Sequence, residues 1–183
     1  NATGTPAPTV VYKIGNTVIT SPHNFPVGVT TVTAIATNST GSDDCTFTVT
    51  VEDNQEPVIN TVASQFMWPP DNKYQRINVA NLINSITDNC GALNKDDAII
   101  LYVTSDEMDD APGGQDGNTT NDIKIASNCK SVELRRERYT GGNGRVYSIH
   151  LSITDGEGNS GTAVVKVHVP ANKKGTPGIE DAV

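Results

Sequence analysis

Aromatic side chains and positive charge are both scarce in this chain of 183 residues. Aromatic residues make up 5% of the sequence, and 21 acidic side chains against 13 lysines and arginines give a formal net charge of −8. A protein that binds nucleic acid neutralises phosphates with a basic face, so this balance argues against a nucleic-acid partner. The apolar runs are also far shorter than the roughly 20 residues that a membrane-spanning helix needs. We therefore expect a protein that neither binds nucleic acid nor spans a membrane.

Motifs of the common enzyme classes are missing as well. The sequence has no Gly-x-Ser-x-Gly elbow, no His-Glu-x-x-His and no glycine-rich phosphate loop before a helix. The three histidines are scattered: His23 lies in a loop-like stretch, while His150 and His168 fall within strand-like runs where a solvent-facing histidine is common. We therefore predict that the chain is not an enzyme.

Cysteine is rare and its count is odd. The chain has Cys45, Cys90 and Cys129, so at least one of them has no partner within these residues. Cys90 and Cys129 both fall in the second half of the chain, and we predict a disulfide between them. Cys45 would then pair with a residue upstream of residue 1. Disulfides form in oxidising compartments, so we expect an extracellular or cell-surface location.

What the sequence has in abundance is short runs in which valine or isoleucine alternates with threonine and other polar residues. This period of two is typical of half-buried strands, and no segment has a convincing helical period. The predicted strands of the first part are 9–14, 17–20, 29–36 and 45–51. Those of the second part are 58–63, 74–79 with a continuation to 86, 98–104, 122–126, 131–138, 145–153 and 161–169. The sequence therefore predicts an all-β fold.

A short acidic stretch divides these strands into two groups. Pro57 favours an extended chain before it, so the segment from 52 to 57 is expected to form a short, stiff hinge. Seven strands suit an immunoglobulin-like sandwich of about 100 residues, whereas four do not. We predict tandem immunoglobulin-like β-sandwiches at 1–56 and 57–170, the first one N-terminally incomplete, and a linker or tail at 171–183.

The first part resembles a known family. The segments FPVGVTTVTA at 25–34, CTFTVTV at 45–51 and DNQEP at 53–57 are similar to the C-terminal two-thirds of a HYR (hyalin repeat) domain. The resemblance implies an immunoglobulin-like repeat of the kind that occurs in tandem in extracellular proteins, where it is linked to cell adhesion, and in bacterial surface proteins and secreted enzymes. The strand that usually opens a HYR domain, with its own cysteine, is absent here.

The second part resembles a bacterial immunoglobulin-like repeat that is often found beside HYR domains. The similarity rests on MWPPDNK at 67–73, ITDNCG at 86–91 and TDGEGNS at 154–160, and it spans about 57–170. It implies a non-catalytic spacer or adhesion module.

The hinge is a candidate calcium site. Three carboxylates and an asparagine lie within five residues there, and such a linker repels itself unless a cation is bound. In an up-and-down sandwich, the connection after residue 86 and the loop at 155–159 should lie at the same pole as the hinge, together with the turn at Cys129. Ca²⁺ takes six to eight oxygen ligands. The expected ligands are Asp53, Asn54, Glu56, Asp88, Asn89, Asp155, Glu157 and Asn159. A solvated acidic turn remains the alternative.

Two further groups of residues could bind a ligand. The acidic, glycine-rich insert at 105–122 could hold a second cation, although the EF-hand spacing is not met and a solvated loop is an equal alternative. Its candidate ligands are Asp109, Asp110, Asp116, Asn118 and Asp122. A glycan could contact Trp68 and the arginines Arg135, Arg136 and Arg138. A charge-paired sheet face for the arginines, and a tryptophan that plugs the end of the sandwich, are the simpler interpretations.

Two functions stay open on the sequence alone. The first is a structural or adhesive repeat of a calcium-stiffened stalk or filament, whose partners are neighbouring repeats in the same protein or filament and possibly a glycan or a cell-surface protein. The second is a carbohydrate-binding accessory module of a secreted enzyme.

Overall fold

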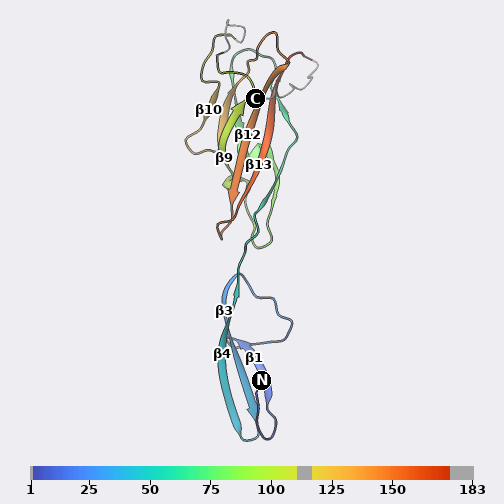
Figure 1. The fold of residues 1–183 in the computed structure, drawn as a ribbon, viewed down its shortest axis with the longest axis vertical. Helices are drawn as coiled ribbons and strands as arrows, with labels where there is room; N and C mark the ends of the chain where they lie inside the picture. The colour runs from blue at the N-terminus through green and yellow to red at the C-terminus, as the bar shows by residue number, and fades with distance from the viewer. Residues whose placement is uncertain (1, 111–116, 174–183) are drawn as a thin grey trace. The chain divides into compact units, whose positions relative to one another are not determined.

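The computed structural model describes residues 2–110 and 117–173, and the fold is all-β, as predicted (Figure 1). The chain divides into two compact units, Asn1–Asn54 and Gln55–Val183. Helical structure in the described residues is confined to two short 3-10 turns, η1 (Val79–Leu82) and η2 (Lys95–Asp97). No helix within the described ranges is long and apolar enough to cross a membrane.

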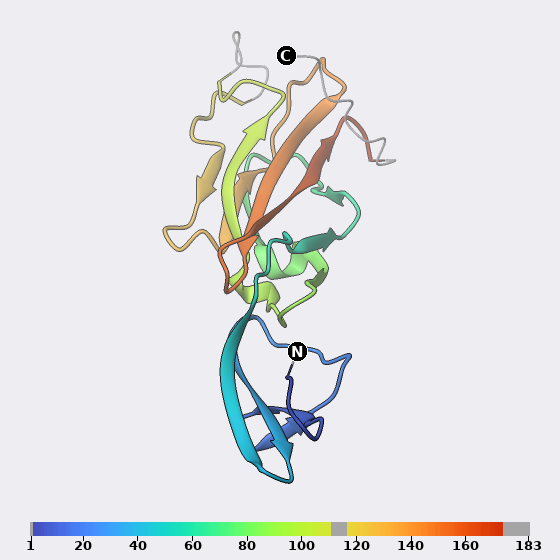
Figure 2. The same cartoon turned by 60° about the horizontal axis from the view of Figure 1, so that its bottom comes forward.

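Unit 1 contains one antiparallel sheet, seen clearly in Figure 2. Its strands are β1 (Thr9–Ile14), β2 (Thr17–Ile19), β3 (Gly28–Asn38) and β4 (Gly41–Val51), in the order β2-β1-β3-β4. The predicted strand at 45–51 begins earlier, because Asn38 closes a tight turn by accepting hydrogen bonds from the N–H and hydroxyl of Thr40. The described part of unit 1 is thus one sheet and no sandwich. An N-terminally incomplete first domain stays a prediction.

The strand register places most of the apolar strand residues of unit 1 on one face, although Val11 and Ile35 pair on the other. Tyr12 pairs with Ala34 and Ala34 with Cys45, so the three side chains form a row on that face. Among the described residues of unit 1, Val32 is the one buried hydrophobic residue, with 1% of its surface exposed. Most of the apolar face therefore remains exposed.

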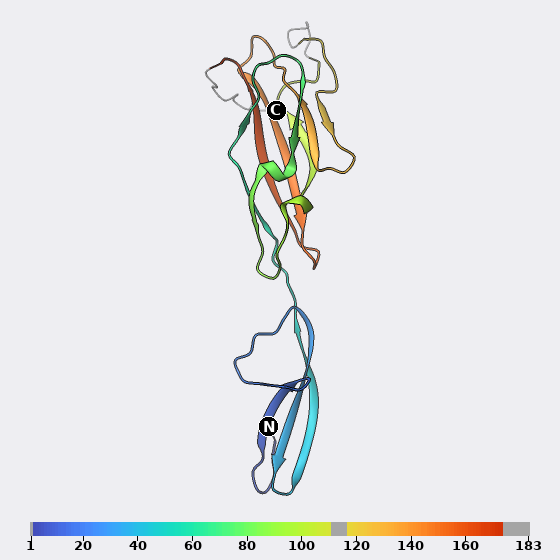
Figure 3. The same cartoon turned by 180° about the vertical axis from the view of Figure 1, so that it is seen from behind.

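Unit 2 is a two-layer sandwich (Figures 1 and 3). One layer contains β5 (Val58–Thr61), β8 (Ile83–Thr87), β7 (Tyr74–Asn78), β11 (Ser131–Arg135) and β10 (Ile123–Ile125). The other contains β6 (Gln65–Phe66), β13 (Ser160–Pro170), β12 (Gly144–Thr154) and β9 (Ile99–Ser105). The first layer pairs as β5-β8 and β7-β11-β10, and the second as β6-β13-β12-β9.

This strand order defines an immunoglobulin-like domain. If β7 and β8 are the two parts of one strand interrupted by η1, the first layer follows the order A-B-E-D and the second places C, F and G side by side. These are the two sheets of an immunoglobulin-like sandwich. The short strand β6 pairs with β13 in parallel and covers the edge of the second sheet.

The core follows from the alternation along β12. Tyr147, Ile149 and Leu151 are each 0% exposed and face the first layer, where Val132 and Leu134 of β11 are also 0% exposed. Two predicted strands are shorter than expected. The strand at 74–86 is interrupted by η1, and the strand at 131–138 ends at Arg135 because its partner β7 begins at Tyr74.

Gly161 allows β5 to lie against β13. A Cβ atom at this position would lie 1.8 Å from the carbonyl oxygen of Pro57, whereas a Cβ at Gly156 would have no neighbour within 4 Å. We expect Gly161→Ala to lower the free energy of unfolding by about 1–3 kcal/mol, because the backbone at Pro57 must move. Gly156→Ala is the control and should change it by less than about 0.5 kcal/mol. Urea unfolding followed by fluorescence of Trp68, the one tryptophan of the chain, measures both. Equal midpoints for the two variants would contradict the close packing.

Candidate functional site

Asp155 organises the tip of the β12–β13 hairpin at one pole of unit 2. Its Oδ1 accepts hydrogen bonds from the N–H groups of Glu157, Gly158 and Asn159 at 3.0, 2.7 and 2.8 Å. Its Oδ2 accepts one from Nδ2 of Asn159 at 2.8 Å. Although desolvation opposes the change, these hydrogen bonds lower the pKa of Asp155. The carboxylate is therefore ionised over the physiological range of pH and fixed in position.

Asp88 brings a second carboxylate to the same pole. It follows directly after β8, whose last residue Thr87 pairs with Val58 at the start of β5. One oxygen of Asp88 accepts from the N–H of Cys90 at 3.1 Å, while the other is buried and has no hydrogen-bond partner among the described residues. A carboxylate oxygen of Asp88 and one of Asp155 lie within 4.8 Å of each other. Two anionic groups from separate loops thus converge where strand β5 begins.

The other predicted calcium ligands belong to the same two loops or to the chain segment that precedes β5. Asn89 and Glu157 are exposed, and Asn159 is half-buried. Glu56 is exposed and precedes Pro57, whose carbonyl packs over Gly161. Asp53 and Asn54 are the last residues of unit 1 and connect directly to Gln55 along the chain.

The candidate ligands of the insert do not converge on one point. Asp109 accepts hydrogen bonds from the N–H groups of Asp122 and Asn121 at 2.7 and 2.8 Å, and these bonds lower its pKa. The carboxylate of Asp122 instead accepts from Arg135 and Arg145. Asp110 and Asn118 are exposed, and Asp116 lies outside the described residues.

A buried ionic network holds this insert to the sandwich. Arg145 and Glu137 are 0% exposed and Asp122 is 2% exposed. The guanidinium of Arg145 contacts Asp122 at 2.5 Å, Glu107 at 3.2 Å and Glu137 at 3.6 Å. It also donates to the hydroxyl of Tyr147 at 3.0 Å and to the carbonyl of Met108 at 2.7 Å. This network was not among the predicted sites, although Arg145 shares the core-facing positions of β12 with Tyr147 and Ile149.

Glu137 carries the most perturbed carboxyl group of the network. Burial raises its pKa to about 7, and the neighbouring carboxylate of Asp122 adds to the rise. The hydroxyl of Thr119 donates to Glu137, and this bond and Arg145 act in the opposite direction. Burial also raises the pKa of Glu107, so the network does not hold all of its carboxylates as permanent charges.

The arginines predicted as a glycan contact are engaged within unit 2. Arg135 donates from Nε to Asp122 at 2.9 Å and lies over the ring of Tyr74, 4.2 Å from its centroid. Arg136 pairs with Asp71 at 2.7 Å, and Arg138 donates to the carbonyl of Tyr139 at 3.2 Å. These contacts favour the interpretation of charge-paired structural residues over an anion-binding surface.

The tryptophan that was expected to plug the sandwich is 40% exposed. Its neighbour Met67 is 1% exposed and enters the core in its place. The N–H of Met67 donates to the carbonyl of His168 at 2.8 Å, which fixes this segment against β13. Trp68 is thereby turned outward and can contact a partner.

No disulfide joins the three cysteines, all of which lie in the described part of the chain. The turn that contains Cys129 was expected at the same pole as Asp88. The carbonyl of Cys129 accepts from the N–H of Ile100, the second residue of β9, which pairs with Leu151 near the end of β12. Lys130 holds this turn against η2 by donating to the carbonyls of residues 96–98. The pairing of Cys90 with Cys129 stays a prediction.

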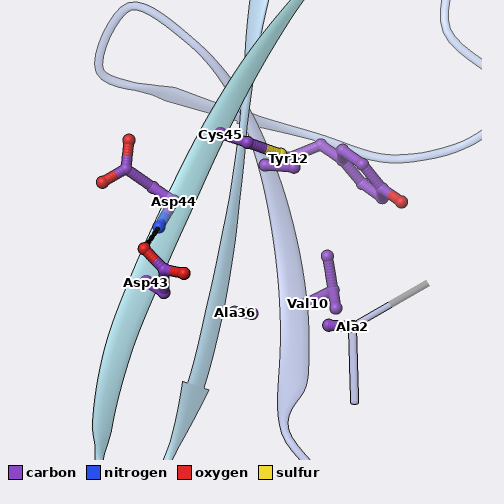
Figure 4. Close-up of a pocket in the computed structure, with 8 residues that line it drawn as sticks. Ala2, Val10, Tyr12, Ala36, Asp43, Asp44 and Cys45 are labelled. Atoms are coloured by element: carbon purple, nitrogen blue, oxygen red, sulfur yellow. Dashed lines mark hydrogen bonds between the residues drawn. The ribbon is translucent and has the colours of Figure 1, made fainter.

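The apolar face of unit 1 carries two hollows. The first, shown in Figure 4, has a volume of about 320 Å³ and is lined by Val10, Tyr12, Asp43 and Cys45 among others. The second has a volume of about 220 Å³ and is lined by Tyr12, Phe25, Phe47 and Val49 among others. Tyr12 lies between the two hollows, with its ring in edge-to-face contact with that of Phe47.

The histidines lie in separate places, each against an aromatic ring. His23 contacts Phe25, His150 stacks on Tyr102, and His168 stacks on Phe66.

No protein-family model matches the chain, and no curated protein matches it. Similar solved structures are tandem immunoglobulin domains. A chimeric titin Z1Z2-Z1Z2 tandem is 18% identical, covering 90% of this chain and 85% of that chain, with a TM-score of 0.28. Titin domains Z1Z2 in complex with telethonin give 15% identity, 91% and 83% coverage and a TM-score of 0.32. Extracellular domains 3–5 of Drosophila OTK give 14% identity, 90% and 52% coverage and a TM-score of 0.29. At these low scores, the immunoglobulin-like assignment rests on the strand order of unit 2.

Proposed function

We propose that this chain is a non-catalytic structural or adhesive repeat of an extracellular stalk or filament, and that calcium stiffens the junction between its two units. The observation that carries the calcium proposal is the pair formed by Asp88 and Asp155. A carboxylate oxygen of each lies within 4.8 Å of the other, and one oxygen of Asp88 is buried with no hydrogen-bond donor among the described residues. A bound cation would satisfy that oxygen and remove the repulsion between like charges.

The hinge would supply further oxygens to the same ion. Pro57 packs on Gly161 beside the hairpin that contains Asp155, so the chain enters unit 2 at this pole. Four residues of chain span at most about 14 Å, which lets Asp53 and Glu56 reach the pole. Together with amide oxygens and loop carbonyls, these groups meet the six to eight oxygens that calcium takes. A ligand set drawn from both sides of a hinge would restrict its bending.

The extracellular location rests on the resemblance of residues 1–56 to a HYR domain and of residues 57–170 to a bacterial immunoglobulin-like repeat. Both kinds of repeat occur in tandem in surface and secreted proteins. The immunoglobulin-like strand order of unit 2 supports the assignment of this unit to a repeat of that kind.

Calcium should raise the melting temperature of unit 2, and EDTA should reverse the rise. A ligand at a hundredfold excess over its dissociation constant stabilises the folded state by about 2.7 kcal/mol. Asp88→Asn should abolish the response, and Asp53→Asn should weaken it if the hinge contributes. Asp155 is a poor choice for this test, because its carboxylate also holds the hairpin tip through four hydrogen bonds.

The matched control for this experiment is Asp96→Asn, which removes an exposed carboxylate that is not among the proposed ligands and should leave the calcium response unchanged. Melting followed by Trp68 fluorescence reports on unit 2, and small-angle scattering in both buffers reports on bending at the hinge. Identical melting curves in calcium and in EDTA would contradict calcium binding and would show that the pole is a solvated acidic surface.

The second candidate function, a carbohydrate-binding accessory module, is favoured by the exposure of Trp68. An exposed indole can stack on a sugar ring, whereas the neighbouring arginines are engaged in internal contacts. A glycan array probed with the parent and with Trp68→Ala separates the two functions. Binding that depends on Trp68 would favour the carbohydrate-binding module.

A further inference from the structure

The outer edge of β4 and the apolar face beside it form an unpartnered surface in unit 1. β4 has 11 residues and lies at one edge of the sheet, whereas β2 at the other edge has three. No strand among the described residues pairs with the outer side of β4. A long edge of this kind presents a row of N–H and C=O groups that can pair with another strand.

The two faces of β4 differ sharply in polarity. Cys45, Phe47 and Val49 point to one face, and the alternating threonines Thr46 and Thr48 point to the other. On the first face Phe47 is 45% exposed and Tyr12 on β1 is 44% exposed. A strand that extends the sheet beyond β4 would need apolar side chains at alternate positions to match this face.

The hollows mark where such side chains would lie. Asp43 and Cys45 line the hollow of about 320 Å³, and Phe47 and Val49 line the one of about 220 Å³. These four residues are alternate positions of the edge strand. A partner strand running along β4 therefore passes both hollows with side chains spaced two residues apart, as in recognition by strand addition.

The charge of the surface adds a further requirement. Asp43 points into the first hollow, and no lysine or arginine lines either hollow. Lys13 is paired with Val18 and Thr33 and so belongs to the opposite face of the sheet. A basic side chain in the partner strand would complement Asp43.

We propose that β4 binds an extended strand of a neighbouring polypeptide chain, with apolar side chains at alternate positions and a lysine or arginine opposite Asp43. This inference deepens the proposed function, since it assigns the surface through which a repeat of a stalk or filament would contact the next chain. The partner is distinct from a second copy of this chain, whose own β4 would bring further acidic residues and no basic one.

The probe for the test is an eight-residue peptide in which threonine alternates with valine and a lysine ends the chain at the carboxyl side. In antiparallel pairing with β4, its valines lie opposite Val49, Phe47 and Cys45 and its lysine opposite Asp43. Binding to the full chain in reducing buffer is measured by fluorescence anisotropy, and the contact is located from NMR amide shifts. We expect saturable binding with shifts confined to unit 1 and largest in β4.

Matched changes on both sides make the test specific. A peptide with glutamate in place of lysine should bind about threefold to tenfold more weakly. Asp43→Lys, an exposed position, should reverse this preference. A peptide with proline at a central position cannot donate to β4 at that position and should bind more weakly still.

Three outcomes would overturn the proposal: no binding of the peptides up to about 1 mM, equal binding of the lysine and glutamate peptides, or concentration-dependent dimers of the chain that bury β4 without peptide. The last would assign the surface to a second copy. The calcium response of unit 2 is read from Trp68 in a separate experiment, so failure here is distinguishable from failure of the calcium proposal.

Discussion

Arg145→Met should lower the free energy of unfolding of unit 2 by about 3–5 kcal/mol, because it leaves buried carboxylates without their cation. Asp122 and Glu137 are 2% and 0% exposed, and Arg145 contacts both of them. Methionine fills much of the volume of the arginine stem, so the loss reports mainly on the charge and its hydrogen bonds. Urea unfolding followed by Trp68 fluorescence measures the change.

Arg76→Met is the matched control on the surface. Arg76 pairs with Glu133 at 3.1 Å, but the two side chains are 65% and 37% exposed. Exposed ion pairs contribute about 0–1 kcal/mol, so this variant should unfold close to the parent. If Arg145→Met lowered the free energy of unfolding as little as Arg76→Met, the buried network would not be what fixes the insert to the sandwich.

The alternation of apolar and polar residues was sufficient to predict most strands. β5, β9, β12 and β13 lie within one or two residues of the predicted strands at 58–63, 98–104, 145–153 and 161–169. It could not predict η1, because an interruption of a strand depends on what packs across it. Here the N–H of Val79 bonds to the carbonyl of Lys130, a contact between segments far apart in sequence.

The residues of the candidate site could be predicted only where the order of strands and loops determines the pole at which a loop lies. The connection after β8 and the β12–β13 hairpin share a pole in a sandwich, and Asp88 and Asp155 lie there. The same argument predicts the turn at Cys129 at this pole, and the structure holds that turn beside Ile100, near the start of β9, through a backbone hydrogen bond. Binding of calcium at the pole stays a prediction.

The buried ionic network was not predicted from the sequence, for a different reason. In the sequence, Arg145 opens a predicted strand and Glu137 lies beside the arginines of the predicted charge-paired sheet face. The insert was an equal choice between a cation site and a solvated loop. One signal was present: Arg145 is in phase with the core-facing residues Tyr147 and Ile149. A buried arginine needs carboxylates, and Glu137 together with the acidic insert supplies them.

Glu137→Gln should make unit 2 less sensitive to rising pH. The pKa of Glu137 is raised from 4.5 to about 7 in the folded state, so the folded protein holds a proton that the unfolded chain has lost between these values. Stability therefore falls as pH rises from about 4.5 to 7 and then levels off, and a shift of this size corresponds to at most about 3 kcal/mol. Glutamine keeps the neutral form at every pH, so its effect should appear only in the upper part of this range.

Urea unfolding of the parent and of Glu137→Gln at pH 5 and pH 8 tests this directly. The two proteins should have similar stability at pH 5, and the variant should be the more stable one at pH 8. Asp109→Asn is the control of opposite sign, because the pKa of Asp109 is lowered by the N–H groups of Asp122 and Asn121. Its carboxylate stabilises the fold above its ordinary pKa of 3.8. The free energy of unfolding of this variant should therefore not increase relative to that of the parent as pH rises. A parent and a Glu137→Gln variant that differ equally at both pH values would show that Glu137 stays ionised in the core, balanced by Arg145 and Arg135.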